Sequence, residues 1–346
     1  MTATAIGLVG CGFFARNHLH AWRDLASEGA ALAAVCDIDP ARAQAAAEEF
    51  GAAHWYSDAA EMFARETLGL VDIATRMDSH RPLVELAVRH RVPTIVQKPF
   101  APDWASCVAM VDTAAEAGVF LDVHENFRFQ TPMQRVREVL ASGAIGKPSW
   151  ARIAFRTGFD VYRTQPYFYG EQRFAILDVG IHVLDLARVF MGEVERVSCE
   201  MQRRNPMVRG EDTATMMLRH LSGAVSIVEC TYECRKLPDA FPETLLEIEG
   251  DNGAIVVKPG LTMDVTSNGH MTTSDIGAPL LPWTSKPWHV AQESVRVTCA
   301  HMLASIRAGR DAETSGVDNL KTFALVEAAY ESAATGRAVA PRSYQA

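Results

Sequence analysis

The sequence predicts an α/β protein in which a doubly wound parallel sheet is followed by an α+β domain on an open, mostly antiparallel sheet. Three observations support this class. An apolar strand-type run leads through Gly10, Gly12 and Ala15 into an amphipathic helical run. Strand-type and helical runs then alternate over roughly the first 125 residues, which is typical of a parallel sheet. After them, short strand-type runs separated by tight turns indicate antiparallel pairing.

The elements of the first domain follow from its apolar runs and from the residues that begin and end helices. Asp58 and Asp103 are expected N-caps, Pro82 opens a helix, and Gly51 and Gly118 end helices. We expect strands at 6–9, 31–36, 54–56, 70–75, 92–96 and 120–123, and helices at 15–25, 40–50, 58–65 and 103–117, with a further one from Pro82.

The second domain starts with one helix and continues as a sheet. Residues 157–174 have no clear period and are predicted to form a long loop, which in a compact domain is usually functional. A sheet that helices cover on one face has a second face that must also be buried, and a partner subunit is the simplest way to cover it. We expect helices at 132–142, 177–191, 289–308 and 318–335, and strands at 150–155, 197–202, 213–219, 224–232, 244–249, 254–258 and 261–266.

Composition excludes several classes of protein. The chain has 346 residues, 48% of them hydrophobic, which predicts two globular domains, here 1–124 and 125–346. A net charge of −9 argues against a nucleic-acid surface. Seven cysteines without metal-ligand spacing indicate reduced thiols. No signal peptide is recognisable, and no apolar stretch approaches about 18 residues, so we expect a cytoplasmic protein without a membrane span.

The glycine motif suits a bound dinucleotide. Gly10 permits a tight turn, Gly12 lets a pyrophosphate approach the backbone, and Ala15 lets the helix pack closely on the strand. The pyrophosphate would lie at the helix N-terminus, where free N–H groups and the helix dipole favour an anion. The alternative is a glycine turn without a ligand, because glycine patterns of this length are common.

Asp37 ends the second strand, a little beyond the roughly 20-residue spacing typical of the acidic residue in a dinucleotide motif. A carboxylate there accepts hydrogen bonds from ribose hydroxyls and repels a 2′-phosphate. No arginine follows it directly, so we expect NAD in preference to NADP. The alternative role, capping the helix that Pro40 begins, suits Asp39 better.

Lys98 is the first candidate for chemistry. It follows a predicted core strand, and ligands of such sheets bind at the carboxyl ends of the strands. Its alternative role is that of a solvated lysine at a strand end. The bond from Lys98 to Pro99 is also a candidate for the cis form.

Asp178 and His182 are the second candidate. Four residues apart, they share a face on a helix, and Gly180 between them permits close approach. They could be metal ligands or an acid/base pair at a substrate hydroxyl, but no further cluster supports a metal. The alternative is a surface pair on a helix. Together with Lys98 they could oxidise a secondary alcohol: histidine is a suitable base, lysine stabilises the alkoxide, and aspartate orients the hydroxyl or the imidazole.

These motifs resemble the glucose–fructose oxidoreductase and inositol dehydrogenase family (Gfo/Idh/MocA) over nearly the full chain. The resemblance implies a Rossmann domain, an open-sheet substrate domain, a homodimer or homotetramer, and Lys98, Asp178 and His182 as the catalytic set. The matching segments are Gly10–His18, Asp37–Pro40, Ala74–His80, Gln97–Pro99, His124–Arg128, Asp178–Asp185 and Glu313–Gly316.

Two departures from the family pattern stand out. The usual Glu before Lys-Pro is Gln97, which removes a carboxylate near Lys98. The usual Thr-Pro-Asn is Thr75-Arg76-Met77, which places a cation near the nicotinamide or pyrophosphate. The full set of expected cofactor-binding residues is Gly10, Gly12, Phe13, Phe14, Asp37, Ile38, Thr75, Arg76, His80, Gln97, Lys98 and Asn126.

The substrate is expected to be a sugar, a cyclitol or a sugar derivative. The 157–174 loop is rich in polar and aromatic side chains, which suit hydroxyls and flat sugar faces. Arg156, Arg163 and Arg173 could instead hold the acid group of a sugar acid. Gln165–Phe168 resembles family members that oxidise aldoses at the anomeric carbon to a lactone. The expected substrate-binding residues are Lys98, Arg128, Arg156, Tyr162, Gln165, Arg173, Asp178 and His182.

The sequence thus predicts an NAD-dependent oxidoreductase that acts on a CH–OH group of a small molecule, without a metal. Two other classes stay open at this point. A non-catalytic NAD-sensing regulator could use the same fold, because fold does not fix function. A lyase or hydrolase that uses NAD transiently would keep the same residues.

Overall fold

The computed structural model describes residues 3–345 and divides into two compact units. The first comprises 1–126, 294–320 and 344–346, and the second comprises 127–293 and 321–343. The first unit therefore adds two later segments to the expected N-terminal domain. No helix among the described residues has both the length and the apolar character needed to cross a membrane.

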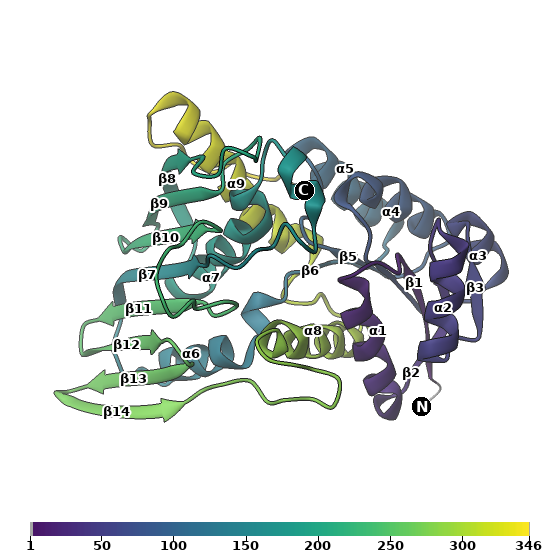
Figure 1. Cartoon of the computed structure of the whole chain (residues 1–346), viewed down its shortest axis with the longest axis horizontal. Coiled ribbons are helices and arrows are strands. Elements are labelled where there is room, and N and C mark those ends of the chain that lie inside the picture. The colour runs from purple at the N-terminus through teal and green to yellow at the C-terminus, as the bar shows by residue number, and fades with distance from the viewer. Residues whose placement is uncertain (1–2, 346) are drawn as a thin grey trace. The chain divides into compact units, whose positions relative to one another are not determined.

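The first unit is built on a six-stranded sheet in the order β3-β2-β1-β4-β5-β6, in which every pair is parallel (Figure 1). This confirms the predicted doubly wound sheet. Because parallel strands need crossover connections, a helix lies between each pair of successive strands. The strands are β1 (Thr4–Val9), β2 (Ala30–Cys36), β3 (His54–Tyr56), β4 (Leu70–Ile73), β5 (Thr94–Gln97) and β6 (Leu121–His124).

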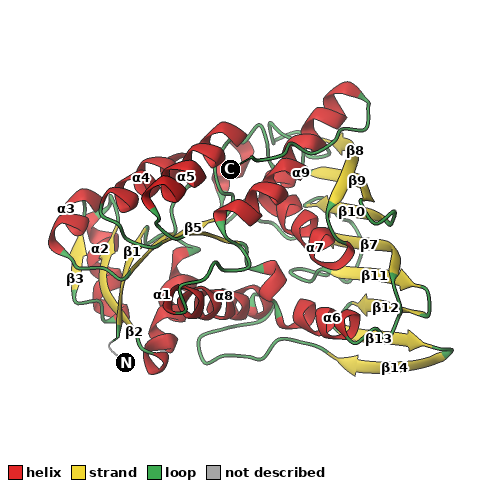
Figure 2. Ribbon diagram, turned by 180° about the vertical axis from the view of Figure 1, so that it is seen from behind, coloured by secondary structure: helices red, strands yellow, loops and turns green. Residues whose placement is uncertain are grey.

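The helices of this unit begin and end where short polar residues and glycines allow. Asp39, Asp58 and Asp103 each cap a helix by accepting a backbone N–H, and Gly51 and Gly118 end helices with a positive φ. Helices α4 and α5 lie on one face of the sheet and α1 on the other (Figure 2). The bounds are α1 (Ala15–Asp24), α2 (Pro40–Phe50), α3 (Ala59–Arg65), α4 (His80–Arg89) and α5 (Trp104–Ala117).

The helix α8 (His289–Arg307) explains why the first unit is not one continuous stretch of chain. Its buried residues Val295, Cys299 and Met302 share a core cluster with Leu19 and Trp22 of α1. This apolar contact stabilises the unit, since fully burying such a side chain is worth about 1.5–3 kcal/mol. A sequence pattern shows that a helix is amphipathic, but not which sheet its apolar face covers.

The second unit is built on an eight-stranded sheet in the order β14-β13-β12-β11-β7-β10-β9-β8. All its pairs are antiparallel except β7 with β10, so the predicted open, mostly antiparallel sheet is confirmed. The strands are β7 (Pro148–Arg156), β8 (Val194–Gln202), β9 (Thr213–His220), β10 (Val225–Thr231), β11 (Leu245–Gly250), β12 (Gly253–Lys258), β13 (Thr262–Ser267) and β14 (His270–Asp275).

The edge strand β14 was not predicted. All its residues are exposed, so it lacks the alternation that marks a half-buried strand. The signal for it is the turn Asn268-Gly269, whose φ values of 49° and 80° are those of a tight hairpin.

Helices cover one face of this sheet. α6 (Thr131–Ala141), α7 (Ile181–Met191) and α9 (Gly316–Thr335) lie on the same side of it in both views (Figures 1 and 2). Along β7 the buried residues Ala151, Ile153 and Phe155 face these helices, while Arg152 and Arg156 alternate onto the other face. No helix of the described part of this unit covers that second face.

Asp122 of β6 gives a prediction about stability. It is fully buried, and neither carboxylate oxygen has a hydrogen-bond partner within residues 3–345. Burial, and next the charge of Asp311, raise the pKa of Asp122 well above its usual value. A carboxyl whose pKa is higher in the folded state destabilises the fold as the pH rises above about 4, the unfolded value.

We predict that the Tm of Asp122→Asn, minus that of the wild type, increases between about pH 4 and about pH 8, because the amide cannot ionise. Thermal melts at a series of pH values measure this difference. The exposed Asp251→Asn is the matched control and should show no such trend. A difference for Asp122→Asn that is constant with pH would contradict the prediction.

Candidate active site

The glycine turn after β1 suits a bound dinucleotide. Gly10 has a φ of +97°, and a side chain there would meet the carbonyl oxygen of Ala74 at 2.6 Å. A Cβ on Gly12 would meet nothing within 4 Å, so the backbone is open on that side. Exposed Phe13 and half-buried Phe14 complete the turn. Helix α1 then begins without a side-chain cap or an acidic residue in its first turn, which leaves its N–H groups for an anion.

Asp37 ties this turn to the end of β2. Its Oδ2 accepts a hydrogen bond from the backbone N–H of Cys11 at 2.7 Å, and its Oδ1 accepts one from Asp39 at 2.9 Å. Ile38 between them is almost fully exposed. Asp39 caps α2 by accepting the N–H of Ala41 at 3.0 Å, which confirms its predicted role.

The segment after β4 carries Thr75, Arg76 and His80. Arg76 is exposed, and its guanidinium lies 3.9 Å from the carboxylate of Asp78. The His80 ring is fully buried, with its nitrogens 3.0 Å from the Phe100 oxygen and 3.2 Å from the Thr75 oxygen. Burial lowers the pKa of His80, so the neutral ring orders this loop through its backbone.

Lys98 follows β5, and the peptide bond to Pro99 is cis. Its backbone N–H donates to Oε1 of Gln97 at 2.6 Å. The carboxyl ends of β1, β2, β4 and β5 are neighbours in the sheet, so the glycine turn, Asp37, the segment from Thr75 and Lys98 lie along one edge.

Asn126 follows β6, the parallel neighbour of β5, at the same edge of the sheet. It is buried, and its Nδ2 donates to Oγ of Ser294 at 2.7 Å, which joins the end of β6 to α8. Its expected contact with the cofactor stays a prediction.

In the second unit, Asp178 lies in a π-helical turn, Ile176–Gly180, directly before α7. The sequence predicts a continuous α-helix here, in which Asp178 and His182 share a face. The π turn alters their spacing around the helix axis, and such turns are frequent at functional sites. A side chain at Gly180 would lie 3.2 Å from the Cys230 sulfur, which explains the need for glycine.

The Asp178 carboxylate is held by Tyr232, a residue the sequence did not reveal. The Tyr232 hydroxyl donates to Oδ2 of Asp178 at 2.5 Å. Burial, and next the charge of Asp178, raise the pKa of Tyr232 well above its usual value, which keeps the hydroxyl protonated. Its ring stacks on Phe174 with the centroids 5.3 Å apart. Tyr232 directly follows β10, and no spacing in the sequence links it to Asp178.

Glu211 is a second residue that the sequence did not reveal. Its Oε1 accepts the backbone N–H groups of Phe174 at 3.1 Å and Ile176 at 3.0 Å, and the Tyr330 hydroxyl at 2.6 Å. These bonds order the start of the π turn that carries Asp178. The only sequence signal is an acidic residue just before a strand, which is too common to assign a role.

The His182 ring stacks face to face on Phe127, with the centroids 3.8 Å apart and an interplanar angle of 1°. His182 is buried on α7. Arg128, which follows Phe127 in the chain, donates to both carboxylate oxygens of Asp185, from Nε at 2.8 Å and from Nη2 at 2.5 Å. This ion pair fixes the backbone beside Phe127 against α7, so the plane of the histidine is set by its neighbours.

Tyr162 and Gln165 lie in the predicted long loop, of which 166–170 form a short 3₁₀ turn. Tyr162 is buried and stacks on Tyr169 with the centroids 4.7 Å apart. Burial raises the pKa of Tyr162. Gln165 accepts a hydrogen bond from the Tyr167 hydroxyl at 2.7 Å. The loop is therefore an ordered aromatic surface with polar groups beside it.

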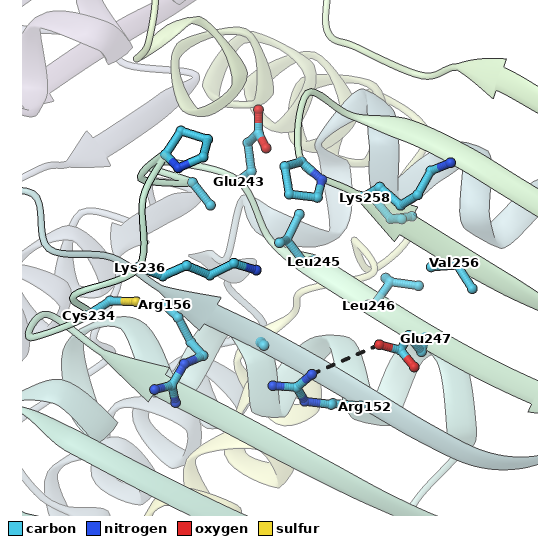
Figure 3. Close-up of a pocket in the computed structure, with 15 residues that line it drawn as sticks. Arg152, Arg156, Cys234, Lys236, Glu243, Leu245, Leu246, Glu247, Val256 and Lys258 are labelled. Atoms are coloured by element: carbon cyan, nitrogen blue, oxygen red, sulfur yellow. Dashed lines mark ion pairs between the residues drawn. The ribbon is translucent and has the colours of Figure 1, made fainter.

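The two further arginines of the predicted substrate set already have partners. Arg173 pairs with Glu327 at 2.5 Å and lies 4.3 Å from the centroid of the Tyr330 ring. Arg156 pairs with Glu229 at 3.0 Å. It lies beside Arg152 among the side chains that line a pocket on the sheet (Figure 3). The placement of Arg156 does not favour contact with a substrate that also meets Asp178 and His182.

Two family models match the chain. Residues 4–125 match the oxidoreductase family with the NAD-binding Rossmann fold, and residues 133–256 match the GFO/IDH/MocA C-terminal domain. The chain belongs to the GFO/IDH/MocA oxidoreductase family. This confirms the resemblance found in the sequence, and with it the NAD-binding Rossmann domain.

Two curated relatives of this family are especially similar. A D-apiose dehydrogenase from Rhizobium rhizogenes is 50% identical over 98% of this chain and 98% of its own length. One from Paraburkholderia graminis is 46% identical over 98% of this chain and 90% of its own. A crystal structure of an oxidoreductase from Agrobacterium radiobacter with NAD+, L-tartaric acid and magnesium has a TM-score of 0.96 and 50% identity, covering 98% of both chains.

The ion pair beside Phe127 gives a second prediction. Arg128 and Asp185 are almost fully buried, so removing Asp185 takes away the carboxylate that pairs with Arg128, whereas Arg188, 3.6 Å from Asp185, keeps its pair with Glu193. We predict that Asp185→Asn lowers the free energy of unfolding by about 3–5 kcal/mol, measured by urea denaturation. Arg128→Met combined with Asp185→Leu should cost less than Asp185→Asn alone.

The exposed pair Arg135–Glu138 is the matched control. Glu138→Gln should cost less than about 1 kcal/mol, because exposed ion pairs contribute little. Equal losses at the two pairs would show that the buried one does not stabilise the unit.

Proposed function

We propose that this protein is an NAD-dependent dehydrogenase that oxidises an aldose of the D-apiose type at its anomeric hydroxyl, giving a lactone. The identity of 50% to a D-apiose dehydrogenase over 98% of both chains carries the proposal. The presence of Lys98, Asp178 and His182 supports catalysis rather than a purely sensing role.

In the proposed mechanism His182 takes the proton of the substrate hydroxyl. Its ring plane is fixed by Phe127, which supports a base in one orientation. The ammonium of Lys98 stabilises the negative charge that develops on the oxygen. Asp178, held by Tyr232, orients the hydroxyl. Bound NAD supplies the hydride acceptor at nicotinamide C4.

The cofactor preference is proposed from Asp37. Its oxygens already accept two backbone N–H bonds, yet each carboxylate oxygen has a second lone pair for a ribose hydroxyl. The negative charge disfavours the 2′-phosphate of NADP. We also propose a cytoplasmic location, because the chain carries seven free cysteines.

The test is NADH formation, followed by absorbance, with NAD and separately NADP and a panel of D-apiose, D-xylose, inositols and sugar acids. Net NADH with aldoses supports the proposal. No net NADH, with NAD binding confirmed by a thermal shift, would overturn it.

We predict that Lys98→Ala and His182→Ala each lower kcat by at least about 100-fold, because charge stabilisation and general base catalysis contribute of this order. Steady-state kinetics at saturating NAD measure the effect. The exposed Lys147→Ala and His270→Ala are the matched controls and should keep wild-type turnover. Unchanged turnover in either Lys98→Ala or His182→Ala would remove that residue from the mechanism.

We further propose that a second copy of this chain covers the uncovered face of the second sheet. Half-exposed Met217 lies beside Ile227, and Ile227 lies beside Arg152, because cross-strand neighbours share a face. A cavity of about 270 Å³ on this face is lined by apolar side chains and by charges of both signs (Figure 3). Interfaces between proteins commonly have an apolar centre and a polar rim, and this mixed surface fits that pattern.

We predict that the wild type has at least twice the mass of one chain in light scattering and that Ile227→Asp shifts it toward a single chain, because a buried charge destabilises the interface. Val317→Asp, at an exposed apolar residue of α9, is the control and should keep the wild-type mass. A wild type with the mass of one chain would overturn this proposal.

A further inference from the structure

A buried chain of hydrogen bonds connects the backbone of Lys98 to a carboxylate in the first unit. The Lys98 N–H donates to Oε1 of Gln97 at 2.6 Å. Nε2 of Gln97 lies 2.9 Å from Nε2 of His18, and Nδ1 of His18 lies 2.8 Å from Oδ2 of Asp72. The indole N–H of Trp22 donates to the same Asp72 oxygen at 2.7 Å. The chain thus spans β5, α1 and β4.

The direction of every hydrogen bond in this chain follows from the group at its start, the backbone N–H of Lys98. A backbone N–H can only donate, so the Gln97 atom facing Lys98 is its carbonyl oxygen. The Gln97 amide nitrogen therefore faces His18 and donates to its Nε2. That leaves the His18 proton on Nδ1, where it is donated to Asp72. Gln97 thus selects the neutral Nδ1-protonated form of His18.

The surroundings leave little room for another arrangement. His18 and Asp72 are fully buried, and Gln97 is 6% exposed. Burial opposes ionisation of Asp72, but His18 lowers the pKa of Asp72 overall. The His124 ring lies 4.3 Å from that of His18, and burial lowers the pKa of His124 to about 3.

Two more groups meet these rings. Phe14 packs edge-on against His18 with the centroids 5.8 Å apart, and the thiol of Cys299 lies 3.7 Å from Nε2 of His124. The chain is therefore enclosed by neutral rings and a thiol, and Asp72 is the carboxylate at its end.

We propose that Gln97 is a positioning residue that holds Lys98 for catalysis by means of this chain. The inference rests on the proposed function, in which Lys98 meets the substrate oxygen. The peptide of Lys98 has its N–H bound to Gln97, and Gln97 in turn cannot rotate its amide without facing two donors, or two acceptors, toward each other. The backbone from which the Lys98 side chain extends is thereby fixed in one orientation.

The test is a double-mutant cycle on kcat with Gln97→Leu, Lys98→Ala and the combined variant. Gln97→Leu should lower kcat by about 10- to 100-fold, because small misplacements at a reacting group have this effect. In the Lys98→Ala background the same change should cost less than about 3-fold, because the side chain that it positions is gone. Equal costs in both backgrounds would overturn the proposal, since Gln97 would then act on the fold or the cofactor.

Two further measurements separate positioning from folding and from cofactor binding. Gln97 is one of the expected cofactor-binding residues, but its amide faces His18 and the Lys98 N–H and is almost fully buried. The Kd of NAD for Gln97→Leu should therefore stay within about 3-fold of wild type, so that the loss is in kcat. Gln97→Glu should recover most of the loss, because a carboxylate accepts from Lys98 N–H and from a doubly protonated His18. A Gln97→Glu variant as impaired as Gln97→Leu would count against the proposal. Should Gln97→Leu not fold, the shorter amide Gln97→Asn replaces it in the cycle.

Gln130→Leu is the matched control. Gln130 is also buried, and its amide atoms have no hydrogen-bond partner within residues 3–345. It should keep kcat within about 3-fold of wild type, as expected for a site without a network. Wild-type turnover in Lys98→Ala would instead overturn the proposed function itself, and the two failures are thus distinguishable.

Discussion

The second unit depends on the buried ion pair of Arg128 and Asp185. Asp185 also accepts the Thr322 hydroxyl at 2.7 Å, so one carboxylate joins α7, α9 and the segment that follows β6. Two charges removed from water are costly unless each is fully satisfied, and this geometry satisfies the carboxylate from two directions. Phe127, which stacks on His182, is the neighbour of Arg128 in the chain.

Buried polar contacts also order the sheet edge of the first unit that carries the glycine turn, Asp37 and Lys98. Asp37 and Gln97 both use side-chain oxygens to accept backbone N–H groups, one at the glycine turn and one at Lys98. Backbone N–H groups at the ends of parallel strands have no hydrogen-bond partner in a neighbouring strand, so side-chain oxygens accept their hydrogen bonds. The residues nearest to the expected chemistry are thus held by polar groups and not by apolar packing alone.

The sequence allowed most of the fold to be predicted, because its signals are local. Asp39, Asp58 and Gly118 mark helix ends by their own backbone chemistry, and the alternating runs reveal a parallel sheet. The positions of the glycine turn, Asp37 and Lys98 at strand ends were also predicted correctly, while their roles stay predictions. The features that could not be predicted are those that depend on contacts between residues far apart in the sequence.

Three such features illustrate the limit. The π turn at Asp178 depends on Glu211 and Tyr330, which are far away in the sequence. Tyr232 contacts Asp178 only because β10 ends there. The edge strand β14 is exposed throughout, so its pairing with β13, rather than any burial pattern, defines it.

The chain passes between the two units three times within the described residues after its first exit at 126, because α8 returns to complete the first core. Neither unit is therefore formed by one continuous stretch of the sequence. A gene fragment that stops at the end of the Rossmann strands would lack Val295, Cys299 and Met302 and would leave Leu19 and Trp22 uncovered. A recombinant that exchanged the N-terminal half of this chain without α8 would have to rebuild this contact between α1 and α8 from non-matching partners.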